Sequence, residues 1–375
     1  MYRILAAAAL AVAALPTAAA QAAEVTASGT EIVVDDNGGR FHQGAETNRL
    51  IAEALPGGEL RLVDQVPLVS KTATCVSVTS LELRCIRPST SPISKLVYRA
   101  RAGNDQLRPS GSLPIRYEGG NGDDLYVAAR TAAPTRVDFQ GGDDPGDLVT
   151  YNAAQAGVTV TKDGVANDGR PGVSDRDNIG KDVDVVAGTR FDDRFGGMVG
   201  VAGFEEFRPL GGDDAVFGGD AFFTLVDMGA AKDGADRVVA GRATEVSYAQ
   251  RTNPVRAGVD LGGADDGEAG EGDELVGVHN VIGGSGDDTM FAADRLDGIG
   301  LSGGPGADSI SGTHHADRLA GGPGRDVLGG RGGNDTLIAD DGDVDHVLCG
   351  DGNGDTARTD TAELTITGCE TRITP

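Results

Sequence analysis

The sequence contains no tryptophan, and only 4% of its residues are aromatic. Basic residues are also scarce, with 32 lysines and arginines against 58 aspartates and glutamates, for a formal net charge of −26. A surface this acidic repels nucleic-acid phosphates and anionic lipid headgroups. We therefore expect no nucleic-acid partner and no binding to anionic membranes through charge.

Sequence signatures of common enzymes are missing as well. None of the five histidines forms an H-E-x-x-H motif, and no G-x-S-x-G motif occurs. Residues 298–303 fit G-x-G-x-x-G, but they lie between turn repeats with no helix after them, so no dinucleotide site is predicted. His314 and His315 occupy variable turn positions, where exposure to solvent is expected rather than zinc binding. We predict no catalytic residues and no enzyme activity.

One enzyme class stays open on composition. Carboxylate pairs, which can catalyse glycoside or uronate chemistry, are abundant in so acidic a chain. A polysaccharide-modifying enzyme on a β-solenoid is therefore the alternative function. Such a site is expected to show a groove with clustered arginine, histidine and aromatic side chains.

Glycine and aspartate are what the chain has in abundance. Glycine makes up 59 of 375 residues, about 16%, where about 7% is usual. Four consecutive blocks of nine residues read GGPGADSIS (303–311), GTHHADRLA (312–320), GGPGRDVLG (321–329) and GRGGNDTLI (330–338). Each block has aspartate at its sixth position and an apolar residue at its eighth.

This nine-residue pattern, G-G-x-G-x-D-x-U-x, resembles the calcium-binding repeat of RTX proteins. The resemblance implies an all-β fold, a parallel β-roll of glycine-rich repeats, with Ca²⁺ as the bound cofactor. In RTX proteins six residues of turn and three of strand form half a coil, so eighteen residues form a full coil. A flexible glycine-aspartate linker is the alternative, but a linker has no reason to keep apolar residues at this period.

Coil stacking should bring aspartates of successive coils together. Asp308 is expected one coil from Asp326, and Asp317 one coil from Asp335, at a strand spacing of about 4.8 Å. Two carboxylates about 5 Å apart repel by about 3 kcal/mol at an effective dielectric of 20. Ca²⁺, which takes about 6–8 oxygen ligands, reverses this repulsion. We predict that Asp308 and Asp326 share a calcium ion, and that the repeats fold when calcium binds.

Further copies of the repeat lie upstream of this array. Residues 119–127 and 283–291 match the whole motif, and weaker copies occupy 102–107, 141–144, 188–195 and 211–217. Glycines contribute by allowing positive φ and close approach of backbone carbonyls. The predicted metal-binding residues are Gly119, Gly122, Asp124, Gly283, Gly284, Gly286, Asp288, Gly303, Gly304, Gly306, Asp308, Gly312, Asp317, Gly321, Gly322, Gly324, Asp326, Gly330, Gly332 and Asp335.

A larger duplication lies inside the looser repeats. Its copies run from 147 to 193 and from 244 to 288, and the matched residues include Tyr151 with Tyr248 and Asp168 with Asp266. In each copy a long acidic loop, 162–182 or 261–278, interrupts the solenoid. Such loops can carry a binding function, but we favour the simpler interpretation that they are plain insertions on one face.

Residues 1–22 have the features of a secretory signal peptide. Arg3 supplies a positive charge, an alanine-rich apolar stretch covers residues 4–15, and Ala20-Gln21-Ala22 fits a cleavage site. A membrane anchor is the alternative, but the stretch is too short to span a bilayer firmly. Many RTX proteins are instead exported by a C-terminal signal, and an N-terminal signal resembles the calcium-repeat proteins of actinobacteria.

The four cysteines fall into two close pairs, Cys75 with Cys85 and Cys349 with Cys369. Export makes disulfides plausible, and four cysteines allow three connectivities. We favour the two local pairings, since each pair lies within one apparent structural unit. A zinc site is the competing interpretation, but the CxxC spacing is missing and the pairs lie far apart.

The expected organisation combines these features. Beyond residue 338 the period fails, because Val344 takes the sixth position, as expected where a solenoid ends in an atypical cap. The domains predicted are a signal peptide (1–22), a small N-terminal β cap (23–98), a degenerate calcium-repeat solenoid (99–282), an RTX-type β-roll (283–338) and a C-terminal disulfide cap (339–375).

The resemblance implies a secreted, extracellular protein with a structural or adhesive role at the cell surface, in association with the cell wall. Its expected partners are calcium ions and a cell-wall glycan or surface protein, and a monomer is expected. A pore-forming toxin would need an apolar or amphipathic segment, which the mature chain lacks.

Overall fold

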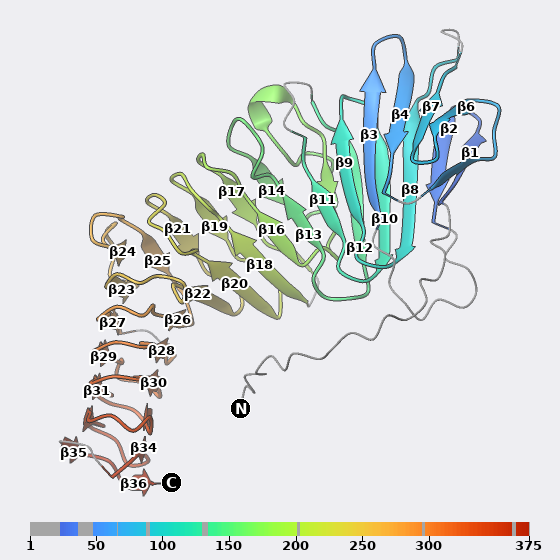
Figure 1. The fold of residues 1–375 in the computed structure, drawn as a ribbon. Helices are drawn as coiled ribbons and strands as arrows, with labels where there is room; N and C mark the ends of the chain where they lie inside the picture. The colour runs from blue at the N-terminus through green and yellow to red at the C-terminus, as the bar shows by residue number, and fades with distance from the viewer. Residues whose placement is uncertain are drawn as a thin grey trace.

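A computed structural model describes residues 23–36, 48–65, 67–87, 91–129, 134–200, 203–294, 297–361 and 365–374. The predicted signal peptide lies outside these residues. In the described part the chain is an all-β solenoid whose coils stack from the N-terminal strands to the C-terminal ones, along an axis that bends near β22 and β26 (Figure 1). Among these residues the single helical element is a 3₁₀ turn at Pro171–Val173. Within the described residues, none of the helical structure is long and apolar enough to cross a bilayer.

One long sheet runs through the whole solenoid. Its strands, in spatial order, are β6 (Cys75–Thr79), β7 (Glu82–Cys85), β4 (Glu59–Val63), β3 (Arg49–Leu55), β9 (Gln106–Ser110), β11 (Leu125–Val127), β13 (Leu148–Thr150), β16 (Val185–Ala187), β18 (Phe204–Arg208), β20 (Phe223–Asp227), β22 (Thr244–Ser247), β26 (Asn280–Ile282), β28 (Gly300–Ser302), β30 (Arg318–Ala320), β32 (Thr336–Ala339), β34 (Thr356–Thr359) and β36 (Thr371–Ile373). From β3 onward all neighbours in this order are parallel, as the repeat pattern predicts.

Three shorter sheets in succession form the opposite face. The N-terminal sheet contains β15 (Asn178–Ile179), β12 (Val137–Gly142), β10 (Ile115–Asn121), β8 (Lys95–Ala102), β2 (Glu31–Asp35), β1 (Ala23–Ser28) and β5 (Leu68–Ser70). The middle sheet contains β14 (Thr159–Thr161), β17 (Arg194–Gly196), β19 (Ala215–Phe217), β21 (Arg237–Val239) and β25 (Glu274–Val276). The C-terminal sheet contains β24 (Gly267–Glu268), β23 (Val255–Val259), β27 (Thr289–Ala292), β29 (Ser309–Ser311), β31 (Val327–Gly329), β33 (His346–Leu348) and β35 (Thr365–Thr367).

The predicted duplication marks the two places where one opposing sheet replaces the next. In the first copy β14 begins the middle sheet while β15 ends the N-terminal sheet, and in the second β23 begins the C-terminal sheet while β25 ends the middle one. The copies also match in detail. Thr161 and Gly258 each donate a backbone N–H to the matched aspartate, Asp168 or Asp266, at 2.6 Å. The long loops therefore form the junctions between sheets.

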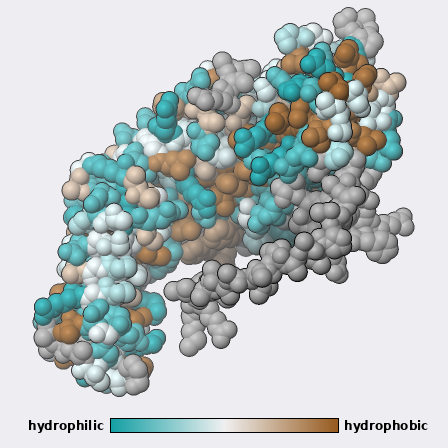
Figure 2. Space-filling view, in the orientation of Figure 1, coloured by the Kyte–Doolittle hydropathy of each residue, from teal (hydrophilic) through white to brown (hydrophobic). Residues whose placement is uncertain are grey.

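The core changes character along the solenoid. Towards the N-terminus it contains stacked aromatic rings, with centroids 5.1 Å apart for Tyr98 and Tyr117 and 4.8 Å apart for Tyr117 and Phe139. In the C-terminal coils the three-residue strands β28 to β31 and β33 each bury one aliphatic side chain, such as Ile310 or Leu328. Apolar residues also gather on the surface over the middle of the solenoid, whereas the C-terminal coils are mostly hydrophilic (Figure 2).

Both terminal regions of the described chain are built into the solenoid. Residues 49–55 form β3, next to the hairpin strand β4. The strands of the N-terminal region add directly to the long and N-terminal sheets, through β3–β9 and β2–β8 pairing. Coils also continue past residue 338, because β33 pairs with β31 and β34 with β32. Both favoured disulfides are confirmed, Cys75–Cys85 and Cys349–Cys369.

Candidate metal centre

The aspartates of the repeat lie immediately before strands, in the last position of each turn. Asp308 precedes β29 and Asp326 precedes β31, and the two strands pair in parallel with Ser309 opposite Val327. The predicted one-coil separation is thereby confirmed. Asp317 and Asp335 stand in the same relation before β30 and β32.

Each aspartate joins its own coil to the preceding one through one carboxylate oxygen. Asp326 Oδ1 accepts the backbone N–H of Asp308 at 2.8 Å, and Asp308 Oδ1 accepts that of Asp288 at 2.7 Å. On the other edge Asp335 Oδ1 accepts the N–H of Asp317 at 2.9 Å. These contacts form ladders of buried carboxylates that run along both edges of the C-terminal coils.

The same ladders extend into the degenerate repeats. Four series occur: Asn48, Asp105, Asp124, Asp147 and Asp184; Asp193, Asp214, Asp236 and Asp273; Asp288, Asp308, Asp326 and Asp345; and Asp317, Asp335, Asp355 and Glu370. In every series the backbone N–H of one member donates to the carboxylate of the next.

The second carboxylate oxygen is directed at the first glycine of the same repeat. A Cβ built on Gly303 would collide with Asp308 Oδ2 and lie 2.8 Å from the carbonyl oxygen of Gly321 in the next coil. A Cβ on Gly312 would meet Asp317 Oδ2 and lie 3.0 Å from the Gly330 carbonyl. Carboxylate and carbonyl oxygens therefore converge on a space that only glycine leaves open.

These convergent oxygens fit a calcium ion. The Oδ2 atoms of Asp308, Asp326 and Asp335 are buried and accept no hydrogen bond. The same is true of Oδ2 of Asp124 upstream. A buried acceptor without a donor is costly unless a cation or water satisfies it. Hard carboxylate and carbonyl oxygens are the donor set that Ca²⁺ prefers.

Without a cation, burial disfavours the charged form of these carboxylates. Burial, together with the negative charges of the neighbouring Asp308, Asp345 and Asp341, raises the pKa of Asp326 to about 7. Burial likewise raises the pKa of Asp308 to about 6, with Asp288 as the main charged neighbour. A dication in the convergent space would hold the carboxylates ionised.

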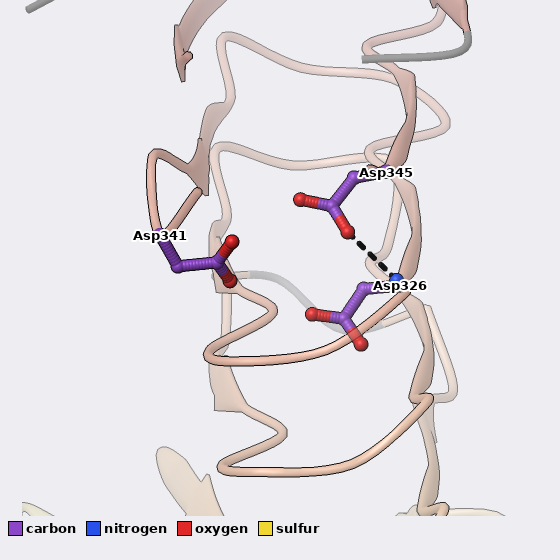
Figure 3. Close-up of side chains that lie close together, drawn as sticks. All are labelled: Asp326, Asp341 and Asp345. Atoms are coloured by element: carbon purple, nitrogen blue, oxygen red, sulfur yellow. Dashed lines mark hydrogen bonds between the residues drawn. The ribbon is translucent and has the colours of Figure 1, made fainter. Parts of the chain in front are cut away.

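Among the described residues, a group of three carboxylates close enough to share a metal ion lies at the β32–β33 turn. One carboxylate oxygen from each of Asp326, Asp341 and Asp345 lies within 4.8 Å of the other two. Figure 3 shows Asp341 on the turn that faces the other two, and the Asp326 N–H donates to Asp345 Oδ1 at 2.7 Å. Asp341 therefore adds a third carboxylate where the regular repeat supplies a glycine turn.

The sequence predicts most of this geometry but not every acidic residue of the ladders and of the cluster at the β32–β33 turn. The structure groups each predicted aspartate with the first glycine of its repeat: Asp124 with Gly119, Asp288 with Gly283, Asp308 with Gly303, Asp317 with Gly312, Asp326 with Gly321, and Asp335 with Gly330. The missed residues are Asp147, Asp184, Asp236, Asp273, Asp341 and Asp345. All of them except Asp341 directly precede a strand. A search for a strict nine-residue period does not detect aspartates by this position.

Comparison with known families supports the metal assignment. Residues 301–328 and 311–344 match the RTX calcium-binding nonapeptide repeat, in four copies. No curated protein matches the chain. The C-terminal coils thus carry RTX repeats, whose ligand is Ca²⁺.

Proposed function

We propose that this chain is an extracellular calcium-binding β-roll protein whose repeat array folds when Ca²⁺ binds. The observation that supports the proposal most directly is the ladder of buried aspartates. At Asp308, for example, Oδ1 accepts a hydrogen bond from the preceding coil, and Oδ2 converges with the backbone carbonyl of Gly321. We assign the calcium to these second oxygens and to the first-glycine carbonyls of the next coil.

The physical chemistry of the array favours coupling of folding to metal binding. Strands of three residues bury one aliphatic side chain each, and glycine loses much conformational freedom on folding. Burying unneutralised carboxylates adds a further cost. Calcium that binds only the folded form stabilises it by about 2.7 kcal/mol per site at a hundredfold excess over the dissociation constant.

The place of action we propose is outside the cell, where calcium is plentiful. The two disulfides fit an oxidising compartment, and the N-terminal segment has the composition of a signal peptide. A solenoid that becomes rigid when it binds calcium after export suits a structural or adhesive role at the cell surface. We propose this role in addition to calcium-driven folding.

The alternative, a polysaccharide-modifying enzyme, receives less support. Its expected groove would combine arginine, histidine and aromatic side chains. A groove of about 830 Å³ among the described residues is lined by arginine, lysine, aspartate, glutamine, leucine and small residues, without histidine or aromatic side chains.

Far-UV circular dichroism of the full mature chain tests the proposal. In EGTA the β signal should be reduced, and addition of millimolar CaCl₂ should restore it. MgCl₂ at the same concentration is the matched control, since Mg²⁺ demands a smaller octahedral shell and keeps its waters. Identical spectra in EGTA and in calcium would refute calcium-driven folding.

A further inference from the structure

A groove on the middle of the solenoid lies apart from the C-terminal calcium array. It follows the ends of neighbouring strands of the long sheet, with Arg190 after β16, Arg208 at the end of β18, Asp227 at the end of β20 and Gln250 after β22. A second hollow of about 490 Å³, lined by residues that follow β13, shares Arg190 with it. The two together span five adjacent strands, or about 19 Å at the usual spacing.

Two cations of this groove are available to a ligand. The Arg190 guanidinium lies over the Phe191 ring at 5.0 Å, and Lys232 Nζ donates to the backbone carbonyl of Ala269 at 2.9 Å. Neither forms an ion pair with a carboxylate among the residues that the structure describes. In a chain with a net charge of −26, such cations form a local attractive site for an anion.

The carboxylates of the groove are held by neighbouring groups. Arg251, which is fully buried beneath it, binds Asp233 at 2.8 Å through Nη2. Asp227 accepts two hydrogen bonds from Gln250 Nε2, at 3.1 and 2.9 Å. Glu271 and Glu268 share the same Arg251 guanidinium, at 2.9 and 3.6 Å, so Asp233 is ion-paired from within the protein. Asp227 and Gln250 present a polar pair that can exchange hydrogen bonds with hydroxyl groups.

Small residues form much of the apolar lining of the groove. Gly211, Gly212, Ala230 and Ala231 line it together with Leu210, so that a bulky ring can approach the backbone. Small apolar surfaces suit the C–H faces of sugar rings, while the rim supplies the polar contacts. Because each coil adds its own side chain, contacts repeat along the solenoid axis.

We propose that this groove binds a linear, carboxylate-bearing polysaccharide extended along the solenoid axis. Arg190 and Lys232 pair with the sugar carboxylates, since guanidinium and ammonium groups form strong charge-assisted bonds with them. Asp227 and Gln250 contact the hydroxyls. The proposal rests on the extracellular adhesive role proposed above and supplies its ligand class and binding surface.

Isothermal titration calorimetry at a fixed, saturating calcium concentration tests the assignment. The probe is an α-1,4-linked galacturonate hexamer, and its fully methyl-esterified form is the neutral control. The wild-type chain should bind the acid form in a saturable manner, and the double variant R190Q/K232Q should bind at least about tenfold more weakly. The variant R318Q removes an exposed arginine of the long sheet outside the groove and should change the affinity less than about twofold.

Each outcome decides the proposal. Equal binding of acid and ester, or wild-type affinity in R190Q/K232Q, overturns it. So does release of shortened sugars, measured as new reducing ends, because it would make the groove a catalytic site. The calcium midpoint of R190Q/K232Q by circular dichroism should equal that of the wild type. A failure of calcium-driven folding would appear in that dichroism titration and leave the comparison of sugar affinities valid.

Discussion

At the scale of single residues, Asp308, Asp326 and Asp335 combine a structural role with the metal-binding role proposed for them. Oδ1 of each accepts an N–H from the preceding coil, and Oδ2 stays buried without a donor. Asparagine in this position keeps an oxygen acceptor for the backbone but loses the charge. The two roles can therefore be separated by one substitution.

The first prediction uses this difference at Asp326. D326N should lose one bound calcium ion and about 2.7 kcal/mol of calcium-dependent stability at a hundredfold excess over the dissociation constant. Native mass spectrometry counts the ions and urea unfolding in calcium measures the stability. D351N is the matched control, since Asp351 is exposed and outside the ladders. An unchanged ion count in D326N would show that Asp326 is not a calcium ligand.

The second prediction concerns pH. Burial raises the pKa of Asp326 to about 7 and that of Asp308 to about 6, whereas 3.8 is the ordinary value. The folded apo state thus binds more protons than the unfolded state, so its stability is greatest at low pH and falls as pH rises from about 4 to about 7. In EGTA, the urea midpoint should decrease from pH 5 to pH 7.5.

Calcium should reverse this trend, because protons compete with the metal for the same carboxylates. In saturating calcium the midpoint should rise over the same pH interval. D308N/D326N, which removes two of these titrating groups, should flatten the slope in EGTA. A midpoint in EGTA that rises from pH 5 to pH 7.5 would contradict the assignment of the raised pKa values.

At the scale of elements, each unit is a turn that ends in aspartate and a strand that buries one residue. The first glycine of the turn is required by space, whereas glycine within a strand is not. A Cβ on Gly321 would collide with Asp326 Oδ2, while one on Gly329 would lie 3.9 Å from its nearest neighbour, the Ile310 carbonyl oxygen. The same substitution should thus have opposite effects at the two sites.

The third prediction compares these glycines. G321A should lower the calcium affinity of its coil at least about tenfold and cost about 1–3 kcal/mol, the usual penalty for overpacking. G329A should be neutral or slightly stabilising, because alanine reduces the entropy of the unfolded chain. Calcium titration calorimetry and thermal unfolding measure both effects. Equal behaviour of the two variants would show that the turn tolerates a side chain.

The sequence predicts the elements that a local repeat pattern specifies, but not those that depend on pairing between distant strands. The period of nine fixes parallel strands and the register of Asp308 with Asp326, because coil stacking allows no other arrangement. It fails at Asp345 and Asp147, where inserted residues shift the count although the aspartate still directly precedes its strand. The succession of sheets at the long loops is set by pairing between distant strands, which local pattern does not encode.

At the scale of the whole molecule, the long sheet is continuous, but the strands and the core packed against it differ along its length. Towards the N-terminus, β8, β10 and β12 are six to eight residues long and enclose the stacked rings of Tyr98, Tyr117 and Phe139. Towards the C-terminus, β29, β30 and β31 have three residues each. Hydrophobic burial per coil decreases in that direction, so dependence on calcium should increase.

The fourth prediction follows from this gradient. In EGTA, amide hydrogens of β27–β34 should exchange at least about tenfold faster than in calcium, because each coil contacts only its neighbours and can open with them. Amides of β8, β10 and β12 should keep most of their protection, since their aromatic core does not need the metal. Hydrogen exchange with mass spectrometry resolves the two regions in a single full-length sample. Uniform loss of protection along the chain would mean that calcium controls one cooperative unit, whereas a graded loss would locate the metal-dependent step in the C-terminal array.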